Sequence, residues 1–210
     1  MDSHGSFSER LRRAVAELRA LAVGEWPPVD PRVGPRGPVW NLVQAFGKVR
    51  PGTAEHHRLA WLALHASRRS LVHWEFSCDG TEPHEALHAV RTWLGHRKAP
   101  ANWDALTTPS RPHEDGEADA RHEDALSTAL SVAHVARLAR NGHPEDAFYA
   151  IAHADLSFAH SPPDVREHFR LWTIDVALPA ALAERDLNPS EAKAVRAHDS
   201  GTMRRRAAVR

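Results

Sequence analysis

Apolar residues recur at three- and four-residue steps along most of this chain, and this spacing limits the possible folds more than any other feature. Leu11, Val15 and Leu18 follow such steps directly after Ser6 and Glu9, which have the spacing of a helix capping box. No segment alternates between apolar and polar residues for more than a few positions, so no strand is predicted. We therefore predict an all-α fold, a single-domain bundle of about six to seven helices.

Proline and glycine mark where the predicted helices begin and end. Residues 26–38 contain five prolines and two glycines, which predicts an extended linker. Residues 96–116 are predicted to form a second long loop. The predicted helices cover residues 6–24, 54–76, 83–95, 117–141, 144 to the Pro162–Pro163 break, and 164 toward Pro179, with a short apolar element at 39–46 and a last short helix introduced by residues 188–190.

These breaks give a simple domain organisation. Residues 1–50 form an N-terminal helix and the proline-rich linker, packed on or beside the main domain. Residues 51–198 form the helical domain, in which the apolar set of segment 54–76 covers too much of the circumference for a surface helix and predicts a central one. In segment 117–141, Leu126 and Leu130 are predicted to face inward. Residues 199–210 are predicted to be a disordered basic tail.

The charges balance overall, with 27 basic and 27 acidic residues, so nothing global indicates nucleic acid or membrane as a partner. Locally they do not balance, because residues 104–146 hold nine acidic and four basic side chains whereas both ends of the chain are basic. One cysteine, Cys78, excludes an internal disulfide. No signal-peptide pattern and no apolar run of about 20 residues is found, so we expect a soluble bacterial protein of the cytoplasm.

His84, Glu85 and His88 form the H-E-x-x-H pattern of zinc hydrolases, in which two histidines bind zinc and the glutamate acts as the base. Pro83 places His84 in the first turn of its helix, and Arg91 and Leu94 occupy the positions of the extended motif's glycine and third histidine. We therefore expect surface histidines and no cofactor, with a metal site at His84 and His88 and a catalytic Glu85 as the alternative.

Seven tryptophans against one tyrosine is an unusual ratio. Four of them fall on helix stripes and are predicted to be core residues, namely Trp61, Trp74, Trp93 and Trp172. The other three lie in or beside the proline-rich segments and are candidate partner-binding anchors, namely Trp26, Trp40 and Trp103. The acidic run that contains Glu114, Asp115 and Glu117 would attract a basic partner. The alternative for these tryptophans is that each holds its loop against the bundle.

Two histidine pairs share a helix face by their spacing, His65 with His73 and His153 with His160. The interpretation that we favour is a buried face on which each ring nitrogen is hydrogen-bonded, rather than a set of metal ligands.

The stretch Arg58 to Phe76, the proline-led segment Pro83 to Gly95, and the alanine-rich segments 125–137 and 147–154 resemble the fifth-type-like family of immunity proteins, which are encoded beside polymorphic-toxin genes. The resemblance covers about residues 54–160. It implies an all-α bundle that neutralises a partner by binding it, and it places His84 and His88 at ordinary positions on a helix surface. The first 50 residues, the 96–116 segment and the tail lie outside the pattern.

Three functions remain open from the sequence. The first is a non-enzymatic binding protein, an immunity or accessory protein whose partner is a protein. The second is the zinc-dependent hydrolase, and the third is a helical regulatory or nucleic-acid-associated module that uses the basic ends. The first is the prediction that we favour, with no membrane and no nucleic acid as its partner.

Overall fold

The computed structural model describes residues 6–22, 34–112 and 120–192, and every regular element within these ranges is helical. The predicted all-α class is therefore confirmed. The elements are α1 (Phe7–Leu21), α2 (Gly37–Ala45), α3 (Ala54–Ser77), α4 (Glu82–His96), α5 (Trp103–Leu106), α6 (Ala120–Asn141), α7 (Pro144–Leu156), α8 (Pro163–Trp172), the π-helix η1 (Thr173–Ala177) and α9 (Leu178–Leu182).

The described residues form nine α-helices, which is more than the predicted six or seven. One extra helix is α5, which lies inside the segment that was predicted to be a loop; the Asn102 side chain accepts a hydrogen bond from the Ala105 backbone N–H at its start. In addition, the end of the predicted linker is helical, because Gly37 and Pro38 begin α2. Proline is tolerated in a first turn, where its missing N–H has no helical partner to lose.

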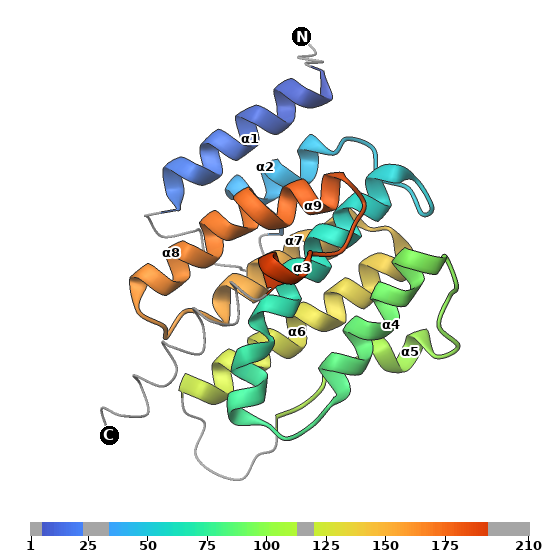
Figure 1. Ribbon diagram of the computed structural model, residues 1–210, viewed down its shortest axis with the longest axis vertical. Coiled ribbons are helices and arrows are strands. Elements are labelled where there is room, and N and C mark those ends of the chain that lie inside the picture. The colour runs from blue at the N-terminus through green and yellow to red at the C-terminus, as the bar shows by residue number, and fades with distance from the viewer. Residues whose placement is uncertain (1–5, 23–33, 113–119, 193–210) are drawn as a thin grey trace.

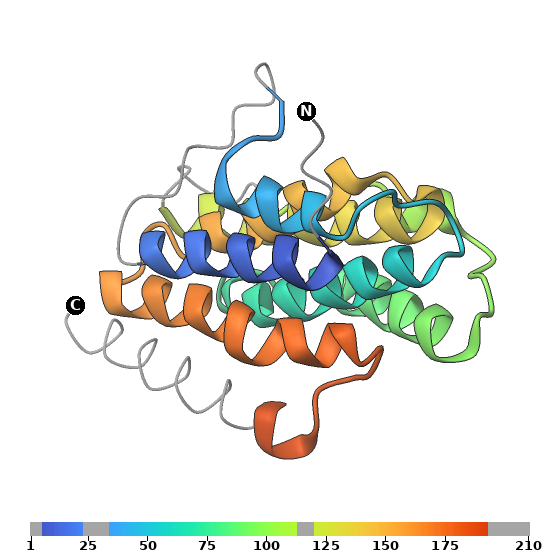
Figure 2. The ribbon, with the colours of Figure 1, turned by 90° about the horizontal axis from the view of Figure 1, so that it is seen from above.

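The helices are arranged in layers (Figures 1 and 2). Figure 2 shows α8, η1 and α9 on one side, α1 and α3 in the middle, and α2, α6 and α7 on the opposite side. One cluster of buried hydrophobic residues runs through these layers and takes members from α1 to α9. None of the helices in the described part of the chain combines the length and the apolar composition that crossing a bilayer requires.

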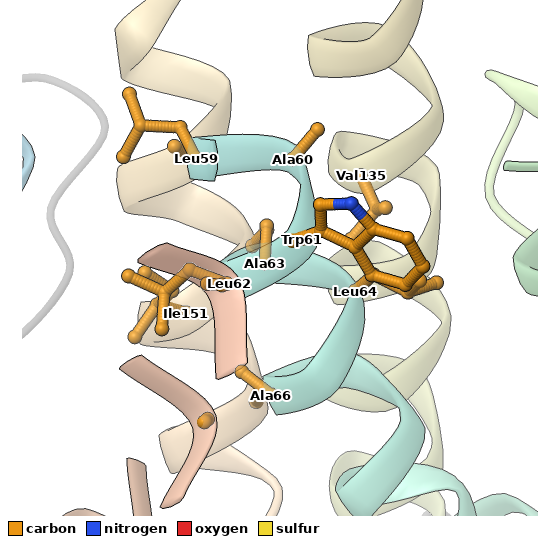
Figure 3. Close-up of a cluster of buried hydrophobic side chains, with 14 of the residues drawn as sticks. Leu59, Ala60, Trp61, Leu62, Ala63, Leu64, Ala66, Val135 and Ile151 are labelled. Carbon is orange, nitrogen blue, oxygen red and sulfur yellow. The ribbon is translucent and has the colours of Figure 1, made fainter. Parts of the chain in front are cut away.

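The predicted central helix is confirmed as α3. Its residues from Leu59 to Leu64 are all buried, although they cover every side of the helix. Figure 3 shows why, since these side chains spread around α3 and meet Val135 of α6 and Ile151 of α7. Trp61, Trp74 and Trp172 are buried and Trp93 packs against the main core, as predicted.

Small residues set the distance between α3, α6 and α7. The Ser67 and Ser131 hydroxyls are 2.6 Å apart, and Ser131 Oγ donates to the Ala150 carbonyl of α7 at 2.7 Å. Ser67 is therefore the donor in the first of these bonds. Thr128 Oγ1 of α6 donates to the Ser70 carbonyl of α3 at 3.0 Å. Each buried hydroxyl thus has a partner, which allows polar residues inside the bundle at little cost.

This close packing overturns one prediction. Leu126 is 38% exposed and Leu130 is only partly buried, whereas Ala125 and Ala129 of the same helix are buried. In the first half of α6 the buried positions hold short side chains (Ala125, Thr128, Ala129 and Ser131), whereas the larger Val132, Val135 and Leu138 are buried further along the helix. Leu126 and Leu130 are consequently left on the outer side.

The helix that begins at Pro163 does not end near Pro179, but continues to Leu182 through one π-helical turn. Proline has no N–H, and its ring collides with the carbonyl four residues before it. In the π turn the Leu178 N–H donates to the Thr173 carbonyl, five residues back, and this wider turn accommodates Pro179.

Gly142 joins α6 to α7 and should not tolerate a side chain. Its φ is +69°, and a Cβ there would lie 2.9 Å from the Pro51 backbone nitrogen. We expect Gly142→Ala to lower the free energy of unfolding by about 2 kcal/mol or more, because alanine is strained in the left-handed conformation and its Cβ would collide with Pro51. Gly52→Ala is the matched control, because its φ is +82° with nothing within 4 Å of the added Cβ. Urea unfolding of both variants measures the difference, and equal losses would contradict the role given to Pro51.

Candidate functional site

The outer side of the α6–α7 hairpin is the candidate functional site. The inner side of both helices packs against α3, and Figure 2 shows the pair on the side of the molecule away from α8 and α9. Partly exposed side chains line the outer side, and we call this surface the α6–α7 face. Its members are Leu126, Leu130, His134, Asp146, Tyr149, His153 and Leu156.

Helical spacing explains why these residues share a surface. Leu126, Leu130 and His134 are four residues apart, which aligns them along α6. Asp146, Tyr149, His153 and Leu156 follow steps of three and four along α7. Because the two helices are antiparallel neighbours, the two rows lie side by side. Tyr149 packs partly against the main core, while the three leucines are not among the residues that do so.

The centre of the α6–α7 face is aromatic and imidazole in character. His134 Nδ1 donates to Asp146 Oδ1 across the two helices at 2.8 Å, and each of these side chains is 14% exposed. The His134 ring is 5.1 Å from the Tyr149 ring and 5.8 Å from the His153 ring, which is nearly parallel to it. Burial, with a smaller contribution from His134, lowers the pKa of His153 to about 4. His153 is therefore neutral at pH 7.

Two of the predicted anchor tryptophans lie on the elements beside this face. The Trp40 ring of α2 meets the Phe148 ring of α7 edge-on at 6.1 Å. Trp103 of α5 meets Trp93 edge-on at 6.2 Å, and α5 is held to α6 by Arg137 Nε, which donates to the Thr107 carbonyl at 3.0 Å. Both indoles are partly buried and used within the fold. Their contact with a partner stays a prediction.

Four other predicted partner-binding residues, Trp26, Glu114, Asp115 and Glu117, lie outside the described residues, as do the predicted tail at 199–210 and most of the proline-rich linker.

The H-E-x-x-H residues lie at the start of α4, as the position of Pro83 suggests. His84 Nε2 is 3.3 Å from Glu75 Oε1, and Glu85 accepts a hydrogen bond from Thr81 Oγ1 at 2.8 Å. His88 is exposed. In residues 6–22, 34–112 and 120–192, no three histidine, cysteine or acidic side chains are grouped so that they could hold a metal ion.

The predicted histidine pairs are only partly as expected. His65 and His73 are buried, and His65 Nε2 is hydrogen-bonded to the Arg185 carbonyl at 3.1 Å. His65 Nδ1, however, has no hydrogen-bond partner in the described part of the chain. The prediction for the other pair is wrong, because α7 ends at Leu156 and the exposed His160 lies beyond the helix that carries His153. His160 Nδ1 is 2.9 Å from the buried carboxylate of Asp124, and His153 Nδ1 has no hydrogen-bond partner among the described residues.

A groove of about 510 Å³ lies between α1 and α2 and is the alternative location for a binding site. Its walls carry charged and amide side chains, but Glu17 already accepts hydrogen bonds from Asn41 and Arg13. Glu9 likewise accepts from the Ser6 backbone N–H as part of the helix cap. Since these carboxylates are paired within the protein, the α6–α7 face is the stronger candidate.

Reasoning from the sequence missed His134, Asp146 and Tyr149 as a group. The signal that could have found them is the spacing of Leu126, Leu130 and His134, which places a histidine in line with two leucines. That line was assigned to the core because large apolar residues are usually buried.

Comparison of the chain with protein-family models, with curated proteins and with solved structures finds no match. The resemblance to immunity proteins therefore stays a prediction.

Proposed function

We propose that this protein is a non-enzymatic helical binding protein, an immunity or accessory protein, and that it binds a protein partner through the α6–α7 face. The observation that carries the proposal is the row of partly exposed leucines beside a partly exposed tyrosine on two adjacent helices. Aromatic residues are enriched and charged residues depleted at the centre of protein interfaces. A contiguous apolar patch on an otherwise polar surface commonly marks such a site.

The charge of the surrounding chain supports a basic partner. Residues 104–146, which include α6 and the start of α7, carry a net charge of −5. A negative region around an apolar centre speeds association with a positive partner. The predicted contributions of Trp40, Trp103 and the acidic run with Glu114, Asp115 and Glu117 belong to this same proposal, as contacts at the edges of the face.

The proposal also includes the organisation and location of the protein. We propose that the helices form one domain with the proline-rich linker near its N-terminal end, and that the protein works in the bacterial cytoplasm. The continuous cluster of buried residues from α1 to α9 supports the first point, and the lack of any cysteine pair in the sequence is compatible with the second.

Photo-crosslinking in host cells tests the proposal. Leu126 on the α6–α7 face and Leu21 at the end of α1 are both 38% exposed, so they form a matched pair. We expect a photoreactive leucine analogue at position 126 to capture one specific protein and the same analogue at position 21 not to capture it. Leu126→Asp should then abolish the capture of that protein by the purified chain, while Leu21→Asp should not.

Both aspartate variants should melt at nearly the wild-type temperature, because exposed substitutions change stability little. Identical crosslinks from both positions, or capture that survives Leu126→Asp, would contradict the proposed use of this face.

A further inference from the structure

Tyr149 gives the α6–α7 face a π surface beside a carboxylate. It is the only tyrosine in the chain, it is partly exposed, and its ring lies next to the His134 ring. Asp146 comes three residues earlier on the same side of α7. Its Oδ1 accepts from His134, while its Oδ2 has no hydrogen-bond donor among the described residues. The neighbouring Glu145 is exposed and is likewise unpaired there.

The two arginines nearest to this carboxylate along α6 are used elsewhere in the fold. Arg137 donates to the Thr107 carbonyl, and Arg140 pairs with Asp104. His153, whose pKa burial lowers to about 4, adds no positive charge at pH 7. This end of the face therefore offers negative charge and aromatic surface together.

Such a combination is suited to a guanidinium group. A guanidinium stacks on an aromatic face and donates to a carboxylate at the same time, because it is planar and its donors lie at its edge. A lysine ammonium is a compact, strongly hydrated point charge that cannot do both equally well. Acidic residues in a first turn also stabilise the helix dipole, so the experiment has to separate binding from helix stability.

We propose that the α6–α7 face binds an arginine side chain of the partner, with the guanidinium over Tyr149 and hydrogen-bonded to Asp146 Oδ2. This inference rests on the proposed function and names the chemistry of the partner's contact residue.

The test uses the full chain with ring-labelled tyrosine, which gives NMR signals from Tyr149 alone. The probes are peptides of alternating arginine and glycine, lysine and glycine, and glutamate and glycine, of equal length. We expect the arginine peptide to shift the Tyr149 ring signals and the glutamate peptide to leave them unchanged. The lysine peptide should bind at least about fivefold more weakly than the arginine peptide.

Two charge-matched variants separate this contact from general attraction. Asp146→Asn should weaken the arginine peptide about tenfold, because it removes a charge-assisted hydrogen bond but keeps an acceptor for His134. Glu85→Gln removes the same charge from the first turn of α4 and should change the affinity less than twofold. Fluorescence anisotropy of a labelled peptide measures the affinities, and melting curves confirm that both variants fold.

The inference would be overturned by any of three results. These are Tyr149 ring signals that do not shift with the arginine peptide, equal affinity for the arginine and lysine peptides, or an equal loss of affinity for the arginine peptide in the two variants. If the Leu126 crosslink to a partner is nevertheless found, the binding function stands and only the arginine contact is wrong.

Discussion

Asp155→Ala is expected to lower the free energy of unfolding by about 3–5 kcal/mol, since it removes one partner from a buried ion pair. For a chain of this length that loss corresponds to a fall of about 6–20 °C in the melting temperature. It is a large part of the total stability of a typical domain, about 5–15 kcal/mol.

The expectation follows from how Asp155 connects three elements. Asp155 of α7 is 2% exposed and Arg170 of α8 is 3% exposed. The guanidinium of Arg170 binds both carboxylate oxygens, with Nε 2.8 Å from Oδ1 and Nη2 3.1 Å from Oδ2. The partly exposed Arg166 side chain donates to the same carboxylate. Arg170 Nη1 also donates to the Ala22 carbonyl at the end of α1. Without the carboxylate, a buried positive charge loses its counter-charge.

A double variant distinguishes an unpaired charge from lost packing. Asp155→Leu combined with Arg170→Met replaces both charges by apolar groups, and we expect it to recover most of the stability that Asp155→Ala loses. Arg166→Ala should cost only about 1 kcal/mol, because that side chain is partly solvated and Arg170 still pairs with Asp155. Chemical unfolding of the three variants gives these values. A double variant as unstable as Asp155→Ala would show that packing, and not charge, is decisive here.

Acid is expected to unfold this protein well above the pH at which its carboxylates titrate. Burial lowers the pKa of His65 and of His153 to about 4, and it also lowers the pKa of His57 to about 4 and that of His56. In the unfolded chain these groups return to about 6.5. As the pH falls below 6.5, the unfolded chain takes up protons that the folded chain does not.

The sign of the effect follows from this difference. The stability contribution of each neutral histidine is complete above pH 6.5 and is lost progressively as the pH falls toward 4. Between these limits each histidine lowers the free energy of unfolding by about 1.4 kcal/mol per pH unit, or about 2 kcal/mol at pH 5. His65 and His153 alone would therefore remove about 4 kcal/mol at pH 5, and we expect the midpoint of urea unfolding to fall steeply from pH 7 to pH 5.

His65→Gln tests this assignment at one site. His65 Nε2–H donates to the Arg185 carbonyl, and a glutamine amide can donate in the same direction without titrating. The pH dependence of its unfolding free energy should be less steep than that of the wild type by about 1.4 kcal/mol per unit between pH 6 and 5. His88→Gln, at an exposed position on α4, is the control and should leave the slope unchanged. An unchanged slope in His65→Gln would contradict the assignment.

The α6–α7 face shows how far the candidate site was predictable from the sequence. The four-residue spacing of Leu126, Leu130 and His134 puts them on one side of α6, but the sequence analysis assigned the two leucines to the core and did not group His134 with them. It did not show which side of α6 faces α3. That choice depends on the short residues opposite, Ala125, Ala129 and Ser131, which allow a closer approach than leucine would.

The sequence by itself determined that the described chain is helical, where α3 begins and ends within one residue, and that Trp61, Trp74 and Trp172 are buried. These features depend on hydrogen bonds, caps and breaks that act within a few residues, so the local pattern is sufficient. Only the tertiary structure decided that Asp146 meets His134, that Asp155 is shared by Arg166 and Arg170, and that His65 Nε2 meets the Arg185 carbonyl. Each of these contacts joins groups from different segments of the chain. The free energy of burying or pairing such groups is several kcal/mol, and it depends on the distance between them in space rather than on their spacing along the chain.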